Sequence, residues 1–329
     1  MSTPAEVSAN FLSVYEDFLK GDANKSDLKP FFTKDVVFER SGQAGLITTL
    51  GGVFEGRATV LKNFRRLRNL VSTKELTVHD VLSNSFAVSP TFEFTPQTNR
   101  IAAATDQYST VRENGKEFRL DQIAYMTVGK KDRISDLRFH YDSYPMAEAI
   151  AGEDDQIPNP NMDDVLEPVR DTEIDTDTAF GIVGNWFGTF GTIEGSRTGD
   201  TSGLVALEAV TQPDALIKFQ GDPDILPFAD TEVRKGIDEF IGTFADQWEH
   251  SYDREFEIQE FFYENDKVIA NTREVRMAVP ENRHYDVMVS IVQTASLENG
   301  GRVNSNEGIF DSMITVTAFN GEYPFINGI

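Results

Sequence analysis

Two histidine–aspartate pairs have a spacing that suits acid–base chemistry. His140 and Asp142 stand two residues apart in a strand-like segment, and His284 and Asp286 repeat this spacing. Residues at i and i+2 lie on one face of a strand, so each carboxylate could orient the imidazole as a general base. The alternative is a structural role, because Asp142 precedes a serine at the end of its strand, where a cap or turn explains it as well as catalysis does.

A second pattern places opposite charges on one face of a strand. In the predicted strand 267–279, Glu274 and Arg276 share a face with Thr272, whereas Arg273 lies on the other face. A buried Glu274–Arg276 pair would be a functional candidate, because buried charges are retained where chemistry needs them. Alternating charges on a strand are also typical of a solvated face, and both interpretations stay open at this point.

No metal or cofactor site is predicted. The chain has no cysteine, which excludes disulfides and thiolate chemistry. The acidic run from Asp171 to Asp177 resembles a calcium loop only in its acids, because it lacks the turn glycine and the terminal glutamate. No glycine motif that would cradle a phosphate is present.

Charge and hydropathy exclude some partners. The formal net charge is −24, from 30 basic and 54 acidic side chains, which disfavours nucleic acid and anionic membranes. No apolar run approaches the roughly 20 residues of a membrane span. The N-terminus lacks the basic and apolar regions of a signal peptide, so we expect a cytoplasmic protein.

The chain reads as two domains with a linker. Residues 151–178 hold ten acidic side chains, one basic side chain and three prolines, which is typical of an extended connection. An acidic docking surface for a basic partner is the alternative for this stretch. We expect a first domain at 1–150 and a second at 179–329.

The two predicted domains repeat the same order of elements. A helix with a Gly21 stop is followed by a strand, a helix and a run of strands, one of them predicted over Phe86–Phe94. The segment Phe11–Phe18 is mirrored by Phe180–Phe187, and Asp142 by Asp311, both at an offset of 169 residues. Helices followed by antiparallel strands indicate an α+β fold, duplicated in tandem.

The order of motifs resembles a known family. A first helix ending at Gly21-Asp22, a strand Asp35–Arg40, a helix opening at Gly56-Arg57 and a terminal hairpin are similar to SnoaL-like polyketide cyclases and ketosteroid isomerases of the NTF2-like superfamily. The resemblance covers about 7–146 and about 178–318. It implies two cone-shaped α+β barrels, each with helices packed on a strongly curved, mostly antiparallel sheet around an apolar cup. It also implies an intramolecular pseudo-dimer, with a homodimer of the chain as a further option.

The catalytic residues of the best-known relatives are missing. Where ketosteroid isomerases carry their proton-donating Asp, the alignment gives Ala124, and where they carry the base it gives Arg40. Their helix Tyr aligns with Val14, or with Tyr15 after a slip of one residue. In the second domain the three positions fall on Val289, Phe219 and Val183.

The third carboxylate of limonene-epoxide-hydrolase-like relatives falls on Phe139, so that set is absent as well. The alignment therefore excludes a ketosteroid isomerase or an epoxide hydrolase that uses these catalytic residues.

The residues that share the face of Ala124 should line the first cup. We expect a ligand site there, with Arg40 orienting the ligand, formed by Arg40, Gln122, Tyr141, Phe38, Met126 and Phe139. Catalytic candidates are Tyr15, His140 and Asp142, although the alignment places His140 on the outer face. The alternative for Arg40 is a strand end that reaches solvent or an acidic neighbour.

Three functions fit this reading. The first is binding of a small hydrophobic molecule with a carbonyl or anionic group, with or without cofactor-independent catalysis. The second is a cyclase, isomerase or lyase of secondary metabolism. The third is a non-catalytic scaffold or protein-docking module. The sequence leaves open which domain is active.

Overall fold

The computed structural model describes residues 2–42, 50–152, 168–193, 202–221, 226–229, 233–279 and 281–320. The chain forms two compact units. Among the described residues, unit 1 contains 2–85 and 96–152, and unit 2 contains 86–95 and 168–320. Most of the acidic stretch expected as a linker, residues 153–167, lies outside the described residues.

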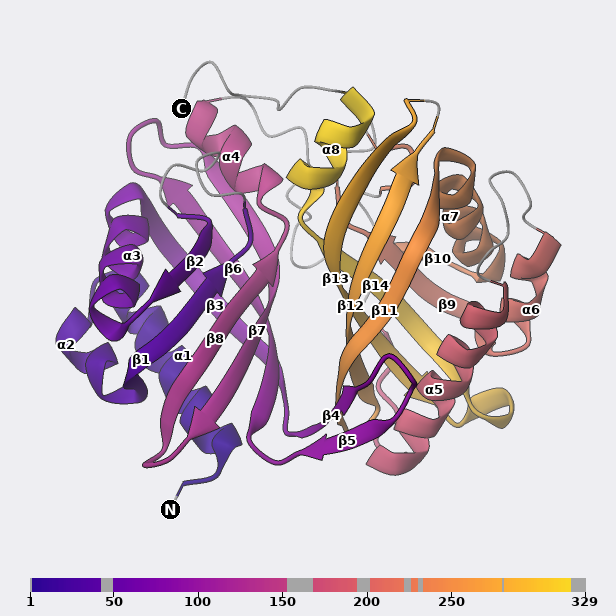
Figure 1. The fold of residues 1–329 in the computed structure, drawn as a ribbon, viewed down its shortest axis with the longest axis horizontal. Coiled ribbons are helices and arrows are strands. Elements are labelled where there is room, and N and C mark those ends of the chain that lie inside the picture. Colours follow the sequence, from indigo (N-terminus) through magenta and orange to yellow (C-terminus); the bar gives the residue numbers. More distant parts are fainter. Residues whose placement is uncertain are drawn as a thin grey trace. The chain divides into compact units, whose positions relative to one another are not determined.

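Unit 1 opens with helices and continues as a sheet (Figure 1). Its helices are α1 (Pro4–Lys20), α2 (Lys25–Leu28), the 3-10 turn η1 (Lys29–Phe31), α3 (Arg57–Leu70) and α4 (Tyr144–Ala151). Its strands are β1 (Phe32–Arg40), β2 (Gly52–Glu55), β3 (Val71–Leu82), β6 (Arg100–Val111), β7 (Glu117–Gly129) and β8 (Arg133–Tyr141).

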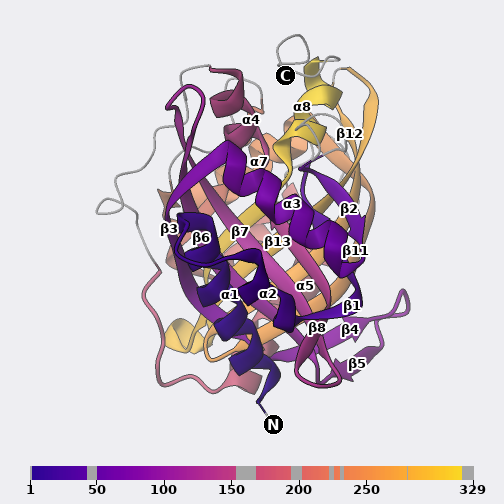
Figure 2. The same ribbon diagram turned by 90° about the vertical axis from the view of Figure 1, so that its left-hand side faces the viewer.

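The first helix ends at the predicted Gly21 stop. Thr3 and Glu6 form a capping box at the N-terminus of α1, and Gly21 ends the helix in the left-handed conformation at φ 105°. The six strands lie in the order β2-β1-β8-β7-β6-β3, with β1 and β8 parallel and the other neighbours antiparallel. Figure 2 shows α1 and α3 lying across one face of this sheet. This face is the interior of the first cup.

Unit 2 repeats the arrangement. Its helices are α5 (Thr176–Ile193), η3 (Ser202–Leu204), α6 (Val205–Glu208), α7 (Ile237–His250), η4 (Glu298–Gly300) and α8 (Ser312–Asn320). Its strands are β9 (Thr211–Phe219), β10 (Arg234–Lys235), β11 (Ser251–Glu264), β12 (Lys267–Ala278), β13 (Arg283–Ser296) and β14 (Arg302–Phe310). The α+β class and the tandem duplication are both confirmed.

The sheet of unit 2 is extended by a hairpin from the first half of the sequence. The strands β4 (Asn84–Val88) and β5 (Phe94–Gln97) follow β11, giving the order β10-β9-β14-β13-β12-β11-β4-β5. Within unit 2, the Phe86 ring stacks on Tyr263 at 5.5 Å and lies tilted against Phe180 at 5.5 Å. The single strand predicted over Phe86–Phe94 is therefore wrong.

A turn interrupts the predicted strand. Pro90 has no N–H for a ladder, and the Phe92 amide donates to the Ser89 carbonyl at 2.8 Å, with Phe92 at φ 57°. The chain therefore reverses between Val88 and Phe94 and pairs as two short strands.

The strand registers identify equivalent positions in the two units. Arg40 lies opposite Phe139 on the last strand of unit 1, as Phe219 lies opposite Gly308 in unit 2. Gln122 pairs with Tyr141 as Val289 pairs with Phe310, so Val289 corresponds to Gln122. By the same pairing Ala124 corresponds to Ile291, so the alignment of Ala124 with Val289 was two residues off.

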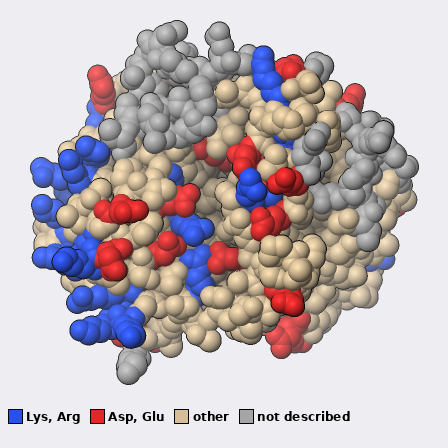
Figure 3. All heavy atoms as spheres, in the orientation of Figure 1, with Lys and Arg blue, Asp and Glu red and all other residues tan. Residues whose placement is uncertain are grey.

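The net charge is unevenly distributed along the chain. Residues 1–152 contain 19 basic and 19 acidic side chains, so residues 153–329 carry the whole charge of −24. In Figure 3, Lys and Arg side chains gather where α2 and α3 lie. The repulsion of nucleic acid and anionic membranes that we expect from the net charge therefore comes from residues 153–329.

Candidate functional site

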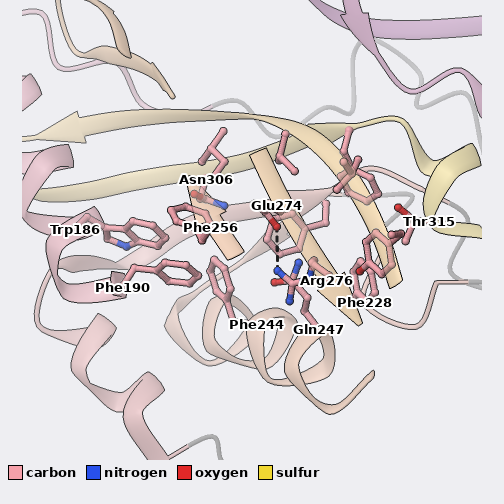
Figure 4. Close-up of a pocket in the computed structure, with 16 residues that line it drawn as sticks. Trp186, Phe190, Phe228, Phe244, Gln247, Phe256, Glu274, Arg276, Asn306 and Thr315 are labelled. Carbon is pink, nitrogen blue, oxygen red and sulfur yellow. Dashed lines mark hydrogen bonds and ion pairs between the residues drawn. The ribbon is translucent and has the colours of Figure 1, made fainter. Parts of the chain in front are cut away.

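A pocket lies inside unit 2, between the sheet and the helices α5, α7 and α8 (Figure 4). It encloses about 530 Å³ of space free of protein atoms, including the part that opens to solvent. Its helix-borne aromatic residues are Trp186, Phe190 and Phe244, and its strand-borne ones are Phe219, Phe256, Tyr285 and Phe310. These walls favour an apolar ligand.

The helical repeat explains the aromatic wall on α5. Trp186 and Phe190 are four residues apart, so they lie on the same face of the helix. Their rings stack at 5.3 Å with planes 8° apart, and Phe244 of α7 lies 5.6 Å from Phe190. The wall is therefore a packed aromatic cluster contributed by two helices.

An ion pair is buried in the opposite wall. Arg276 Nη1 donates to Glu274 Oε2 at 3.0 Å, and the two side chains are 3% and 8% exposed. Arg276 Nε donates to Ser251 Oγ at 3.1 Å, and the single hydroxyl proton of Thr272 can reach Glu274 Oε1 at 3.4 Å or the Val289 carbonyl at 3.2 Å. The solvated alternative for this charged strand is wrong, because this face of β12 is turned toward the pocket.

Burial of this pair carries a free-energy cost that its partners offset. Removing two charges from water is unfavourable unless good geometry and further hydrogen bonds compensate. Ser251 and Thr272 supply such bonds here, so the pair is held in one arrangement. Its two charges cancel, which leaves an overall neutral polar group against an apolar cavity.

Three uncharged polar side chains complete the lining. Gln247 comes from α7, Asn306 from β14 and Thr315 from α8. Asn306 Oδ1 accepts from Gln293 Nε2 at 2.6 Å. The Thr315 hydroxyl is buried and has no hydrogen-bond partner among the described residues. A buried hydroxyl without a partner is costly, so a ligand atom at this end would relieve the cost.

In unit 1 the structure brings two predicted residues into contact. Arg40 is 3% exposed, and its Nη2 donates to the Tyr15 hydroxyl oxygen at 3.0 Å. Tyr15 is buried on the inner face of α1 whereas Val14 is half-buried, so Tyr15 takes the inward position. Burial raises the pKa of Tyr15, and the charge and hydrogen bond of Arg40 partly counteract the rise. The alternative of a solvent-reaching Arg40 is wrong.

The predicted aromatic residues surround Arg40. Its guanidinium carbon lies 5.2 Å from the centre of the Phe38 ring and 5.8 Å from that of Phe139. Phe139 is also 5.3 Å from the Tyr15 ring. The inner face of the first cup at this point is therefore an arginine packed among aromatic rings.

The remaining predicted lining residues share the inner face by register. Tyr141 and Leu137 lie two residues from Phe139 on β8, so they share its inner face. Their partners on β7 are Gln122 and Met126, which therefore lie on the same face. All of these side chains are buried. Gln122 Nε2 has no hydrogen-bond partner among the described residues. Gln122 and Arg40 therefore lie on the same face of the sheet, but no described contact joins them.

The histidine–aspartate pairs lie elsewhere. His140 follows Phe139 in β8 and occupies the opposite face, as expected from its alignment. Asp142 Oδ1 accepts from the Tyr144 amide at 3.0 Å where α4 begins, which is the structural alternative. In unit 2, His284 is exposed and Asp286 pairs with Arg273 at 2.6 Å.

The sequence did not predict the contribution of α8. The strand β14 ends at Phe310, and Ser312 begins a helix. Asp311-Ser312 is a helix-start signal that could have identified α8, which carries Thr315 into the pocket.

The described residues contain no group of three or more His, Cys, Asp or Glu side chains that could hold a metal ion. None of the described helices is long and apolar enough to cross a membrane.

Comparison with known proteins gives neighbours in fold. No protein-family model and no curated protein sequence matches the chain. A candidate isomerase from Bacillus subtilis is 15% identical over 46% of this chain and 99% of its own, with a TM-score of 0.36. An NTF2-like protein from Burkholderia xenovorans is 18% identical over 46% and 98%, with a TM-score of 0.33.

A third solved structure is a candidate SnoaL-like polyketide cyclase from Mesorhizobium loti. It is 16% identical over 43% of this chain and 100% of its own, with a TM-score of 0.31. Each of the three corresponds to less than half of this chain. At these identities and TM-scores the likeness concerns the fold alone.

Proposed function

We propose that unit 2 binds a small, mainly apolar molecule in its aromatic pocket. The observation that carries this proposal is the buried Glu274–Arg276 pair in the wall of a mainly aromatic and aliphatic cavity. A few fixed polar groups among aromatic walls are typical of small-molecule sites, where they orient the ligand.

The charges of the pocket favour a neutral ligand. Glu274 already neutralises Arg276, so an anion or cation would have to break the pair or enter without a counter-charge. A carbonyl or hydroxyl group can bind beside the pair and at the Thr315 hydroxyl without adding charge. We therefore expect a neutral compound with one or two oxygen functions on an aromatic or aliphatic body.

The test is native mass spectrometry of the full chain purified from its own host, followed by extraction of the bound molecule. We expect one neutral compound per chain. Thr315→Val removes the unpartnered hydroxyl while keeping the shape, so the fold should persist and occupancy should fall about tenfold. The double variant Glu274→Leu with Arg276→Met should also lose the compound.

Arg273→Gln is the matched control, because Arg273 lies on the same strand but pairs with Asp286 on the exposed face. It should retain the compound. Both tryptophans of the chain, Trp186 and Trp248, belong to unit 2, so re-addition of the compound can be followed by their fluorescence. An empty protein whose tryptophan fluorescence ignores a panel of neutral aromatic and terpenoid compounds would refute the proposal and favour a scaffold or docking role.

Turnover of the bound compound is a second candidate function. It is favoured by Glu274, a buried carboxylate in the pocket wall, because positioned carboxylates serve as general bases. Glu274→Gln keeps the size and a hydrogen-bonding group but removes the basicity. A variant that still binds the extracted compound and no longer converts it would support catalysis, and equal conversion would exclude Glu274 as the base.

A further inference from the structure

Unit 1 contains a buried cation that no described carboxylate neutralises. Arg40 is 3% exposed and makes one described hydrogen bond, from Nη2 to the Tyr15 oxygen at 3.0 Å. Its Nε is buried and has no hydrogen-bond partner among the described residues. The described ion pairs of unit 1 do not include Arg40.

The surroundings of Arg40 only partly offset the cost of burying its charge. An arginine stays protonated in proteins, so it cannot avoid this cost by losing a proton. The two rings at 5.2 and 5.8 Å attract the cation. This attraction is weaker than the penalty for burying an ion without a counter-charge.

The free donors indicate the shape of the missing partner. Nε and Nη2 form one edge of the guanidinium, and Nη2 keeps a second N–H after the bond to Tyr15. A carboxylate fits such an edge because its two oxygens accept two parallel hydrogen bonds. Gln122, on the same inner face, offers another buried donor without a described partner.

The single positive charge of Arg40 indicates that the missing partner is a monoanion. The other polar side chains that register places on this face are neutral, including Thr105, Gln107 and Gln122. One carboxylate would balance Arg40, whereas a dianion such as phosphate would leave a buried excess of negative charge. The adjacent Phe38 and Phe139 rings favour an apolar body on the acid.

We propose that the cup of unit 1 binds a small organic acid whose carboxylate pairs with Arg40. This site is separate from the pocket of unit 2 and does not depend on the function proposed for it. The two cups would then take ligands of different charge, a monoanion in unit 1 and a neutral molecule in unit 2.

The experiment is isothermal titration of the full chain with sodium benzoate at constant ionic strength, with sodium chloride as the balancing salt. We expect one benzoate per chain. Arg40→Met should weaken binding at least tenfold, and Arg40→Lys should weaken it less, because it keeps the charge but loses the fork. Arg68→Met is the matched control, because Arg68 also lies over a ring, that of Phe18 at 5.0 Å, but reaches the surface.

A second measurement does not depend on the variants. In the folded chain, the buried Arg40 Nε–H should give a nitrogen-correlated NMR signal that shifts on adding benzoate. Equal benzoate affinity in the wild type and Arg40→Met, or no binding at all, would overturn the proposal. Binding that is lost in the Glu274→Leu, Arg276→Met variant and kept in Arg40→Met would place benzoate in unit 2 and also overturn it.

Discussion

The two units place different side chains on equivalent backbone positions. By register, Gln107 and Ser109 on β6 correspond to Glu274 and Arg276 on β12. Gln107 Nε2 donates to Ser109 Oγ at 2.9 Å, where Arg276 donates to Glu274 at 3.0 Å. The same two-residue spacing thus holds a neutral pair in one cup and an ion pair in the other.

The buried arginine also occupies different positions in the two units. Unit 1 carries Arg40 on its first strand, opposite Phe139, where unit 2 has Phe219 opposite Gly308. In unit 2 the positive charge lies on β12, where Glu274 neutralises it. The scaffold therefore fixes where side chains point, while the charge and chemistry of each cup depend on a few inward positions.

The largest effect should come from breaking the charged pair. Arg276→Met leaves Glu274 buried without its counter-charge, and we expect unit 2 to lose about 3–5 kcal/mol of unfolding free energy. Urea unfolding followed by tryptophan fluorescence measures this, since Trp186 and Trp248 both lie in unit 2.

Replacing both partners provides the control for that result. Glu274→Leu with Arg276→Met removes both charges, and such exchanges are often nearly neutral. Ser251 and Thr272 keep other acceptors, the carbonyls of Gln247 and Val289 at 3.1 and 3.2 Å. A double variant as unstable as Arg276→Met would show that the pair matters for its shape and not for its charge balance.

A second prediction concerns the close contact between the Phe219 ring and Gly308. A Cβ on Gly308 would lie 2.3 Å from Cδ1 of Phe219, so Gly308→Ala forces the ring to move. We expect a loss of about 1–3 kcal/mol in unit 2, the range for overpacked cores. Gly129→Ala in β7 is the control, because its nearest contact would be an ordinary 3.7 Å. Equal stabilities in these two variants would contradict the packing argument.

The fold could be predicted from the sequence because its signals are local. The Gly21 stop and the periodicity of the strands each specify an element without tertiary information. The β4–β5 hairpin was missed because its place is decided by non-local packing. The sequence around Phe86 and Phe94 contains no local signal that predicts the packing of their rings on Phe180.

The site was only partly predictable for a related reason. Strand alternation gave the inner face around Arg40 and identified Glu274 and Arg276 as sharing a face, but it does not tell a buried face from a solvated one. That distinction depends on which helices cover the sheet. The helix α7 spans Ile237–His250, which brings Phe244 and Gln247 to the pocket.

A smaller effect is expected when the arginine of unit 1 is replaced. Arg40→Met removes a buried charge that has no described counter-charge and leaves only the Tyr15 hydroxyl without its donor. We expect a change within about 1 kcal/mol, because the loss of a charge-assisted hydrogen bond and two ring contacts opposes the relief of desolvation. Hydrogen exchange of β1 and β8 amides, read by mass spectrometry, reports on unit 1. A loss as large as that of Arg276→Met would show that Arg40 has a buried counter-charge within the chain.

The smallest effect is a pH dependence confined to unit 1. Burial raises the pKa of Tyr15 above its ordinary value near 10, so the folded state holds the phenolic proton more tightly than the unfolded state does. Tyr15 therefore contributes stability that is fully present below about pH 10 and is lost as the pH rises through its folded pKa. The slope for one such group is at most about 1.4 kcal/mol per pH unit.

The difference between the wild type and Tyr15→Phe isolates this contribution. The variant lacks the phenol, so its unfolding free energy should fall less steeply above pH 10, and the difference spectrum of tyrosinate absorbance gives the pKa of Tyr15 directly. Arg40→Met should move that pKa further upward, because it removes the cation and the hydrogen bond that lower it. An unchanged pKa in Arg40→Met would mean that the guanidinium charge is already neutralised beside Tyr15, and the contrast between a neutral and a charged cup would have to be redrawn.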